Sequence, residues 1–312
     1  MTKAKEKKNI LITCAGGSAP LYLANVLKRK YNVFLVDASP NIAAAKLNLP
    51  FAQVPFGNSP KYFAVLNSLV QKWHIDCIVP GADEELLKVS RLCQFFPHLS
   101  AVIPTPEFIV TCLNKKSTMQ LLANNKISFL SPFRRYQIHY PAIVKPIYGR
   151  GSRQVHKITT PRELTGYLKL YNQKFNQILV HPYIGGTEYT VSVIVNNLNE
   201  LIGIVPKKVI IKQGITLAAV TEKNELINQA CKKIVFTLKP QGPFNVQLKV
   251  YRRKVYIFEI NPRLSTTSVL TDKAFGNEIE LYLKYFNQTK IINPPHLKPG
   301  VYLYRYYENV FV

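Results

Sequence analysis

The chain has 312 residues, of which 47% are hydrophobic and 19% are charged. These proportions are typical of a globular protein and exclude a disordered one. No apolar run approaches the roughly 20 residues of a membrane span, and the basic start passes directly into a short strand, unlike a signal peptide. The five cysteines show no CxxC spacing. We therefore expect reduced thiols and a cytoplasmic location, without zinc or disulfides.

The formal net charge of +24 comes from 41 Lys and Arg residues against 17 acids. A basic surface attracts anions, including nucleotides, acidic substrates, nucleic acids and membrane headgroups. The excess is spread along the chain and lacks the cluster on one helix expected of a nucleic-acid reader. Codon usage of the source organism explains the many Lys and Asn residues equally well. We therefore expect no membrane partner and treat nucleic-acid binding as the weaker alternative.

The first hundred residues alternate β-rich runs with helical patterns. Expected strands cover residues 10–13, 33–36, 75–79 and 101–103, and expected helices cover residues 19–30, 60–72 and 83–95. This alternation predicts an open parallel sheet with helices on both faces. The run Pro104-Thr105-Pro106 then interrupts the pattern. We place a domain boundary there, between a Rossmann-like α/β lobe of residues 1–104 and a second domain of residues 105–312.

The first lobe also invites a rival interpretation. A glycine turn follows the first expected strand and Asp37 follows the second, as in the dinucleotide fingerprint. However, Ala15-Gly16-Gly17-Ser18-Ala19 does not follow the pattern G-x-G-x-x-G. A nicotinamide cofactor is therefore the weaker hypothesis for this lobe.

The second part of the chain changes to strands grouped between a few helices, an α+β pattern. Expected helices cover residues 114–124, 161–171, 224–239 and 278–286, and expected strands cover residues 143–145, 155–158, 178–181, 189–195 and 201–209. No internal repeat is visible in this part.

Residues 244–263 predict a β-hairpin that carries polar residues where apolar ones would be expected. With a turn near residues 251–254, paired positions sum to about 506, so Gln247 should lie opposite Glu259 with Cβ atoms roughly 5 Å apart. Asn261 points to the same face as Glu259. Three oxygen donors, one of them charged, suit Mg²⁺, which takes its remaining ligands from water and phosphates. The alternative is a plain solvent-exposed hairpin face.

The run Glu259-Ile260-Asn261-Pro262-Arg263, with Asn245-Val246-Gln247 before it, resembles the metal site of the ATP-grasp superfamily. It is most similar to the branch of single-copy carboxylate–amine ligases related to the carbamoyl phosphate synthase large subunit. Other runs resemble further family elements in the expected order, namely residues 11–17, 112–115, 141–146, 179–191 and 300–307. The resemblance implies an ATP-grasp fold of two α+β subdomains behind the first lobe, with a lid at about residues 117–185. One copy is present, so carbamoyl phosphate synthesis, which uses two, is not expected.

The resemblance also implies an ATP site. Its residues are Lys115 and Lys145 on the triphosphate, Gly149, Gly151 and Ser152 in a phosphate loop, Pro182, Tyr183 and Ile184 facing adenine, and Glu188 on the ribose. Lys145 lies in a buried-looking strand, where a lysine without an anion is costly. A solvated helix face for Lys115 and a plain turn for the glycines remain alternatives. His181 and Gln154 depart from the family pattern, which commonly has Glu or Gln and Gly there.

The same resemblance assigns the remaining site residues. Gln247, Glu259 and Asn261 would bind Mg²⁺, with Mn²⁺ as an alternative ion. Arg263 would address the transferring phosphoryl group, because its planar fork matches phosphate oxygens, and Lys208 is a weaker candidate for the γ-phosphate. Substrate contacts are expected from Ser265, Thr266 and Thr267 and from residues 212–214.

These assignments predict a ligase that uses ATP and Mg²⁺ to phosphorylate a carboxylate, which an amine then attacks to form an amide. Every group found serves a phosphate or a metal, and positioning with charge neutralisation is the main requirement of phosphoryl transfer. The expected partners are a small carboxylate and an amine, such as amino acids or a peptide, and a homodimer is compatible with the chain. The alternative is a non-catalytic ATP-binding regulator.

Overall fold

A five-stranded parallel sheet with strand order β3-β2-β1-β4-β5 forms the N-terminal lobe of the computed structural model, which describes residues 7–306. The first six residues of the basic start and Tyr307 of the closing run lie outside the described residues. The strands are β1 (Asn9–Ile12), β2 (Asn32–Asp37), β3 (Phe51–Gln53), β4 (Cys77–Val79) and β5 (Ser100–Ala101). The helices are α1 (Pro20–Leu27), α2 (Tyr62–Lys72) and α3 (Leu86–Phe95), with short 3-10 turns at Ala43–Lys46 and Asp83–Glu85.

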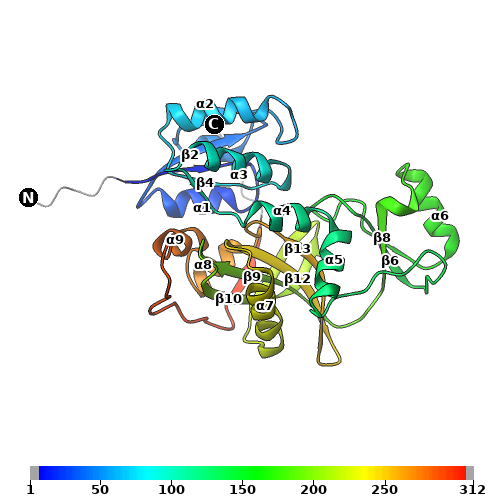
Figure 1. Ribbon diagram of the computed structural model, residues 1–312. Coiled ribbons are helices and arrows are strands. Elements are labelled where there is room, and N and C mark those ends of the chain that lie inside the picture. The colour runs from blue at the N-terminus through cyan, green and yellow to red at the C-terminus, as the bar shows by residue number, and fades with distance from the viewer. Residues whose placement is uncertain (1–6, 307–312) are drawn as a thin grey trace, which may run out of the picture.

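Helices cover both faces of this parallel sheet. Leu11 and Ile78 pack with α2 and α3 in one apolar cluster, whereas Ile10 and Ile12 pack with α1 on the opposite face. The second cluster also takes in Ile279, from a helix much later in the chain, so it joins the lobe to the rest of the molecule. The predicted α/β lobe is confirmed (Figure 1).

The lid is a small separate layer beside the main body (Figure 1). Its antiparallel sheet has the order β7-β6-β8, formed by β6 (Ala142–Pro146), β7 (His156–Ile158) and β8 (Ile178–Pro182). Helix α6 (Pro161–Leu170) buries Leu164 and Tyr167 against this sheet. A 3-10 turn at Phe175–Gln177 leads into β8.

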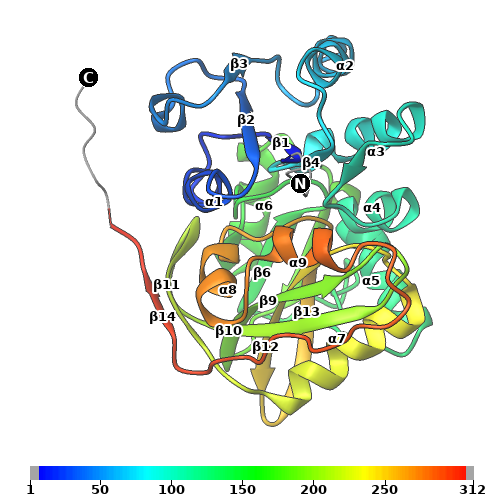
Figure 2. The same cartoon turned by 90° about the vertical axis from the view of Figure 1, so that its left-hand side faces the viewer.

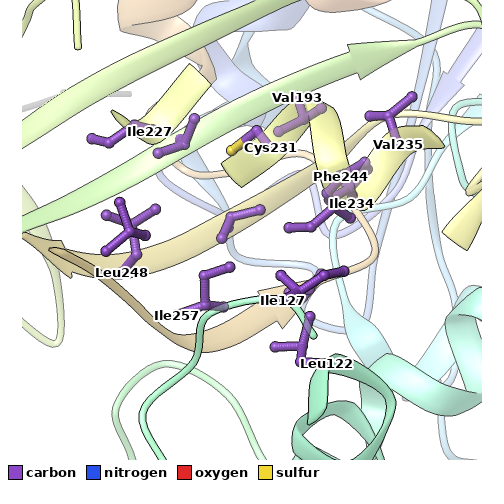
Figure 3. Packing of buried hydrophobic residues seen from close by; sticks show 14 of the residues in the cluster. Leu122, Ile127, Val193, Ile227, Cys231, Ile234, Val235, Phe244, Leu248 and Ile257 are labelled. Atoms are coloured by element: carbon purple, nitrogen blue, oxygen red, sulfur yellow. The ribbon is translucent and has the colours of Figure 1, made fainter. Parts of the chain in front are cut away.

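A six-stranded antiparallel sheet, with order β13-β12-β9-β10-β11-β14, forms the body of the second part. Its strands are β9 (Thr187–Val195), β10 (Leu201–Gln213), β11 (Ile215–Thr221), β12 (Phe244–Tyr251), β13 (Lys254–Asn261) and β14 (Tyr302–Tyr304). The helices of this part are α4 (Pro106–Leu113), α5 (Lys115–Asn124), α7 (Glu225–Leu238), α8 (Ser268–Ala274) and α9 (Glu278–Lys284). The largest apolar cluster packs α4, α5 and α7 against one face of this sheet (Figure 3), and α8 and α9 lie at the other face (Figure 2).

The register of the hairpin β12–β13 matches the prediction for its functional end. Gln247 pairs with Glu259 and Asn245 pairs with Asn261. Nearer the turn the pairing shifts by one residue, because a bulge lies between the Gln247 and Leu248 positions. Arg252 and Arg253 form the turn itself with φ of 47° and 58°, the left-handed values that two-residue hairpin turns require.

The predicted elements are largely confirmed, and most of the omissions are short elements. The sequence patterns missed α4, α8, β3, β11 and β14, of which all but α4 and β11 are short. Strand β10 runs four residues past its predicted end at Val209, across irregular pairing with β11. Within residues 7–306 all five cysteines are free thiols, and no helix there has the length and apolarity to cross a membrane.

Candidate active site

Three adjoining cavities lie between the lid, the large sheet and the N-terminal lobe. The first cavity, about 280 Å³, lies where the lid meets the large sheet. The second, about 620 Å³, lies at the carboxyl ends of the parallel strands. The third, about 80 Å³, shares Gln247 and Glu259 with the first cavity and Arg263 and Thr266 with the second. The hairpin β12–β13 therefore connects the first and third cavities, and the segment after β13, residues 263–266, connects the third to the second.

Three lysines, Lys115, Lys145 and Lys212, line the first cavity together with Glu259. Lys145 on β6 is 5% exposed, and its Nζ donates to the carbonyl of Phe258 at 2.8 Å. Lys115, at the start of α5, lies 3.7 Å from a carboxylate oxygen of Glu259. Burial lowers the pKa of Lys145 to about 8, Glu259 acts in the opposite sense, and Lys115 and Lys212 add to the lowering. Cations held this close together in a buried site favour an anionic ligand.

Lys212 completes this cationic wall from the far end of β10. Its Nζ lies 2.6 Å from Glu188 and 3.4 Å from Oε1 of Gln247. Because Glu188 is on β9 and Gln247 is on β12, this one lysine reaches two neighbouring strands of the sheet. The predicted ribose ligand and one predicted metal ligand are thus held by the same cation.

The oxygen donors of the hairpin face the third cavity. Gln247, Glu259 and Asn261 all line it, and Asn245 lies beside them. The Nδ2 of Asn261 donates to Oδ1 of Asn245 at 3.4 Å, which leaves the amide oxygen of Asn261 for a ligand. One carboxylate and two amide oxygens are hard donors that suit Mg²⁺ with water and phosphate as further ligands. Among residues 7–306 no three His, Cys, Asp or Glu side chains gather as a metal site, so softer metals find no donor set there.

The phosphate loop between β6 and β7 has an unusual backbone. Gly149, Gly151, Ser152 and Gln154 all have positive φ, with Gln154 at 58°. Successive residues of this kind turn backbone N–H groups toward one side, as in anion-binding nests. Gln154 adopts the left-handed conformation, and its carbonyl accepts a hydrogen bond from the Tyr167 hydroxyl at 2.9 Å.

The strand β8 and the segment after it supply the opposite wall of the first cavity. His181, Pro182, Tyr183 and Ile184 line this cavity together. Lys249 donates to the carbonyl of Ile184 at 2.9 Å and lies over the Tyr183 ring. His181 is 1% exposed, and burial lowers its pKa well below the usual value, so it lines the cavity as a neutral side chain.

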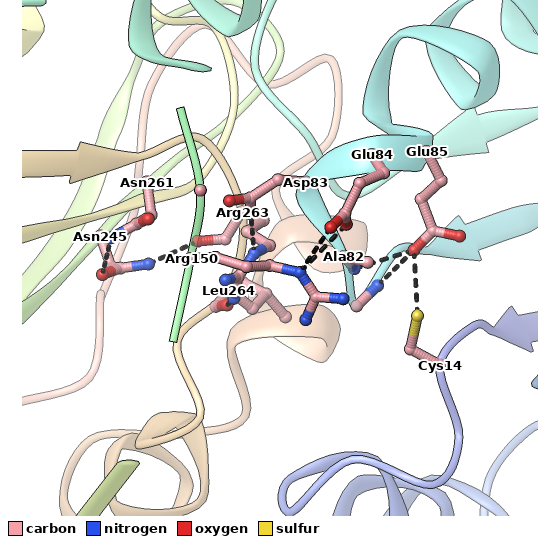
Figure 4. Close-up of polar contacts among 12 residues, drawn as sticks. Cys14, Ala82, Asp83, Glu84, Glu85, Arg150, Asn245, Asn261, Arg263 and Leu264 are labelled. Carbon is pink, nitrogen blue, oxygen red and sulfur yellow. Dashed lines mark hydrogen bonds and ion pairs between the residues drawn. The ribbon is translucent and has the colours of Figure 1, made fainter. Parts of the chain in front are cut away.

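Two ion pairs join the arginines of the site to the N-terminal lobe (Figure 4). Arg263 pairs with Asp83 and also donates to the carbonyl of Leu264 at 3.1 Å. Arg150 of the phosphate loop directs its Nε at both carboxylate oxygens of Glu84, each at 3.0 Å. Both arginines line the second cavity. The acids that balance them come from one short turn after β4.

The predicted site residues fall into three groups in the structure. Eleven line the first cavity, and they are Lys115, Lys145, Gly149, Ser152, His181, Pro182, Tyr183, Ile184, Glu188, Gln247 and Glu259. Gly151, Asn261 and Arg263 line the third cavity, as do Ser265 and Thr266 and, from residues 212–214, Lys212 and Gly214. Lys208 lines none of the three cavities, and Thr267 is 1% exposed behind the loop.

Sequence reasoning gave one cation of the site a different role and did not propose three others. Lys212 was expected only as a loop contact to substrate, because the strand was predicted to end before it. Lys249, Arg150 and Arg153 were not proposed, although Lys249 is the only base within β12 and the two arginines lie next to the predicted phosphate-loop residues. Their positions beside Gln247 and beside Gly149, Gly151 and Ser152 were the available signal.

Comparisons with known proteins show what this chain is similar to. Residues 174–308 match a family model described as "ATP-grasp in the biosynthetic pathway with Ter operon". The chain is 32% identical over 152 residues to the carbamoyl phosphate synthase large chain of Buchnera aphidicola, covering 45% of this chain and 14% of that one. The corresponding chain of Haemophilus ducreyi is 29% identical over 156 residues, covering 46% and 14%. The chain thus spans about a seventh of the length of these curated relatives.

Solved structures show the same fold over almost the whole chain. An N5-carboxyaminoimidazole synthetase from Staphylococcus aureus, complexed with ADP, matches with a TM-score of 0.77 at 16% identity over 95% of this chain and 82% of that one. A biotin carboxylase from Campylobacter jejuni in a complex with a β,γ-ATP compound gives 0.71 at 13% identity, covering 94% and 74%. An L-amino acid ligase from Bacillus licheniformis gives 0.69 at 17%, covering 95% and 78%. The chain thus shares the fold of these solved structures, residues 174–308 match an ATP-grasp family model, and somewhat under half of the chain is similar in sequence to carbamoyl phosphate synthase large chains.

Proposed function

We propose that this protein is an ATP- and Mg²⁺-dependent ligase that joins a carboxylate to an amine. The observation that carries the proposal is the pairing of Gln247 with Glu259 at the wall shared by the first and third cavities, beside Lys115, Lys145 and Lys212. Oxygen donors for a hard cation and ammonium groups for phosphates then meet at one place. A nucleotide triphosphate in the first cavity would end with its transferable phosphate in the third.

The first cavity has the parts that ATP requires. We infer that the backbone of residues 182–184 and the side chain of His181 face adenine, that Glu188 binds the ribose, and that Lys115 and Lys145 bind the triphosphate under residues 149–152. Gln247, Glu259 and Asn261 would hold Mg²⁺, or Mn²⁺ in its place, which when bound neutralises the charge of the phosphates.

The reaction needs two transfers. A carboxylate oxygen attacks the γ-phosphorus of ATP, the bond to the β-phosphate oxygen breaks, and ADP leaves with an acyl phosphate remaining. The amine nitrogen then attacks the acyl carbon, phosphate leaves, and the amine loses a proton to give the amide. Arg263 lines both the second and the third cavity. Its guanidinium can bind the transferring phosphoryl group there when the phosphoryl oxygens replace the carboxylate of Asp83 as its partner.

The second cavity is the place that we assign to the carboxylate and the amine. It borders the third cavity through Arg263, Ser265 and Thr266, so a carboxylate there can reach the transferable phosphate. The relatives carry names such as L-amino acid ligase and N5-carboxyaminoimidazole synthetase. We propose small-molecule substrates of this kind, a division into residues 1–104 and 105–312, a cytoplasmic location and, as a secondary proposal, a homodimer.

A coupled assay for ADP tests the proposal. Purified protein with ATP and Mg²⁺ is screened against pairs of amino acids and other small acids and amines, with amide products followed by mass spectrometry. We expect at least one pair to give ADP, phosphate and an amide in equal amounts. A protein that binds Mg-ATP but never releases ADP would instead be the regulatory ATP-binding module. Affinity for nucleic acid that falls steeply with salt would favour the third alternative.

A further inference from the structure

We infer that Arg305 is a positioning residue that holds together the walls of the second cavity and thereby sets binding of the carboxylate or amine substrate. Its guanidinium donates to three backbone carbonyls from three separate segments: Ser18 at 3.1 Å, Thr216 at 3.0 Å and Thr266 at 2.5 Å. Ser18 belongs to the N-terminal lobe, Thr216 to β11 and Thr266 to the loop before α8. This inference rests on the proposed function, because it names a residue that serves the second cavity.

The three carbonyls belong to segments that line the substrate side of the site. Ser18 and Thr266 line the second cavity, and Thr216 and Thr266 line the third. None of the three lines the first cavity. A displacement of these segments would therefore alter the second and third cavities, where we place the substrate and the transferable phosphate, while the walls of the first cavity, built from other segments, keep their shape.

Arginine suits this contact for a chemical reason. The guanidinium is planar and presents five N–H donors in a fixed fork, whereas an ammonium group is a compact point charge. Within residues 7–306 no carboxylate forms an ion pair with Arg305, so backbone oxygens alone satisfy it there. Partial burial lowers its pKa, which agrees with a charge enclosed by carbonyls.

The backbone around Arg305 is itself anchored to the large sheet. Tyr304 of β14 pairs with Ala218 of β11, and the backbone N–H of Arg305 donates to the carbonyl of Leu217 at 2.9 Å. The Cα of Arg305 is thus held by β11, and its side chain extends from this strand to the N-terminal lobe. The run of residues 300–306 gains a role beyond closing the sheet.

A second cation, Lys207, contacts the loop before α8 from the side of the large sheet. Lys207 is fully buried, donates to Ser192 and to Thr271 at 2.9 Å, and lies 3.5 Å from the carbonyl of Thr267. Consecutive carbonyls of the loop, at Thr266 and Thr267, therefore face two different cations. Lys207 therefore holds the loop before α8 against the large sheet. The contact with Arg305 then sets how far this loop extends toward the second cavity.

The test compares Arg305→Met and Arg305→Lys with the matched control Arg253→Met, an exposed arginine in the hairpin turn. For a substrate pair found by the ADP screen, we expect KM for the carboxylate or the amine to rise at least about tenfold in Arg305→Met, since charge-assisted hydrogen bonds are lost. The Kd for ATP should stay within about twofold, because no wall of the first cavity moves. Arg305→Lys should fall between, and Arg253→Met should match the wild type.

Hydrogen exchange supplies a readout that does not need turnover. In Arg305→Met, the amides of residues 16–19 and 264–269 should exchange faster, and those of residues 142–145 should not change. Unchanged KM values in folded Arg305→Met, or in Arg305→Lys if the first variant does not fold, would overturn the inference. So would an equal loss of ATP affinity, which indicates general destabilisation. If the wild type releases no ADP with any pair, the proposed function fails. The positioning role of Arg305 is then tested by hydrogen exchange alone, and unaltered exchange in the two segments would reject it.

Discussion

The first and second cavities are built in different ways. Strands and their immediate continuations form the first: β6 brings Lys145, β8 brings His181, and the hairpin brings Gln247 and Glu259. The second cavity is assembled from turns at the ends of parallel strands and from loops that come much later in the chain, as far as Ser268. The spacing of motifs therefore predicts the residues of the first cavity, whereas those of the second come together only through packing between the N-terminal lobe and the rest of the molecule.

The two cavities also balance their charges differently. In the first, Lys115, Lys145 and Lys212 share the carboxylates of Glu259 and Glu188, so the cations are in excess. In the second, acids from the turn after β4 pair with two of the three arginines that line it, Arg150 and Arg263 but not Arg153. An excess of cations suits a polyanion such as a triphosphate, and balanced pairs suit a smaller ligand that exchanges with a carboxylate. We therefore expect ligand binding in the first cavity to weaken more than binding in the second when one charged side chain is replaced by a neutral one.

The largest expected effect comes from the wall that the cavities share. Replacing Glu259 with Gln removes the one carboxylate of the predicted metal site, and turnover should fall by about a hundredfold or more. Initial rates of ADP release at saturating ATP and Mg²⁺ measure the loss. Glu225→Gln, at an exposed helix start, is the matched control and should keep full activity. A folded Glu259→Gln protein with normal turnover would show that the hairpin is not the metal site.

The next prediction concerns the protonation of Lys145, which should affect ATP binding in the first cavity and not substrate binding in the second. Below about pH 8 Lys145 is protonated without a ligand, and above it the group is mostly neutral. A bound triphosphate raises this pKa, so binding above pH 8 takes up a proton and ATP affinity should fall as pH rises. Lys145→Met should weaken ATP binding about tenfold to a hundredfold, with little effect on substrate binding in the second cavity.

Calorimetry in buffers of different ionisation enthalpy measures this proton uptake directly. Lys145→Arg keeps its charge at all accessible pH values, so its proton uptake at pH 8.5 should be smaller than that of the wild type. Equal uptake in the two proteins would assign the pH dependence to another group.

The same contrast explains how far sequence reasoning reached. The alternation of Val246, Leu248 and Val250 with polar residues predicted the hairpin and, to within one residue, its register, while the exact opposition of Gln247 and Glu259 depends on the bulge next to Gln247. The alternation is a local signal. The sequence did not predict that Arg263 would face Asp83, 180 residues earlier, because nothing in the local pattern encodes the docking of two domains.

A smaller effect is expected at the end of β10, which the sequence pattern placed at Val209 and the structure places at Gln213. Strand β10 continues past Val209, and irregular pairing with β11 brings Lys212 to the cavity wall while Lys208 stays outside all three cavities. Lys212→Met should lower kcat/KM for ATP about tenfold, since it releases two neighbours, Glu188 and Gln247. Lys208→Met should change it by less than about twofold. The reverse order of effects would restore Lys208 as the phosphate ligand.

The smallest expected effect concerns the phosphate loop over the first cavity. Gln154 holds a left-handed conformation that costs an L-residue about 1 kcal/mol, and Gln154→Gly removes this cost while raising the entropy of the unfolded chain. The two terms nearly cancel, so the free energy of unfolding should change by no more than about 1 kcal/mol. The glycine also loosens the loop, and stopped-flow release of a fluorescent ADP should become up to about threefold faster. Because the Tyr167 hydroxyl binds the backbone carbonyl of residue 154 and not its side chain, a much larger change in either quantity would mean that the Gln154 side chain itself closes the cavity.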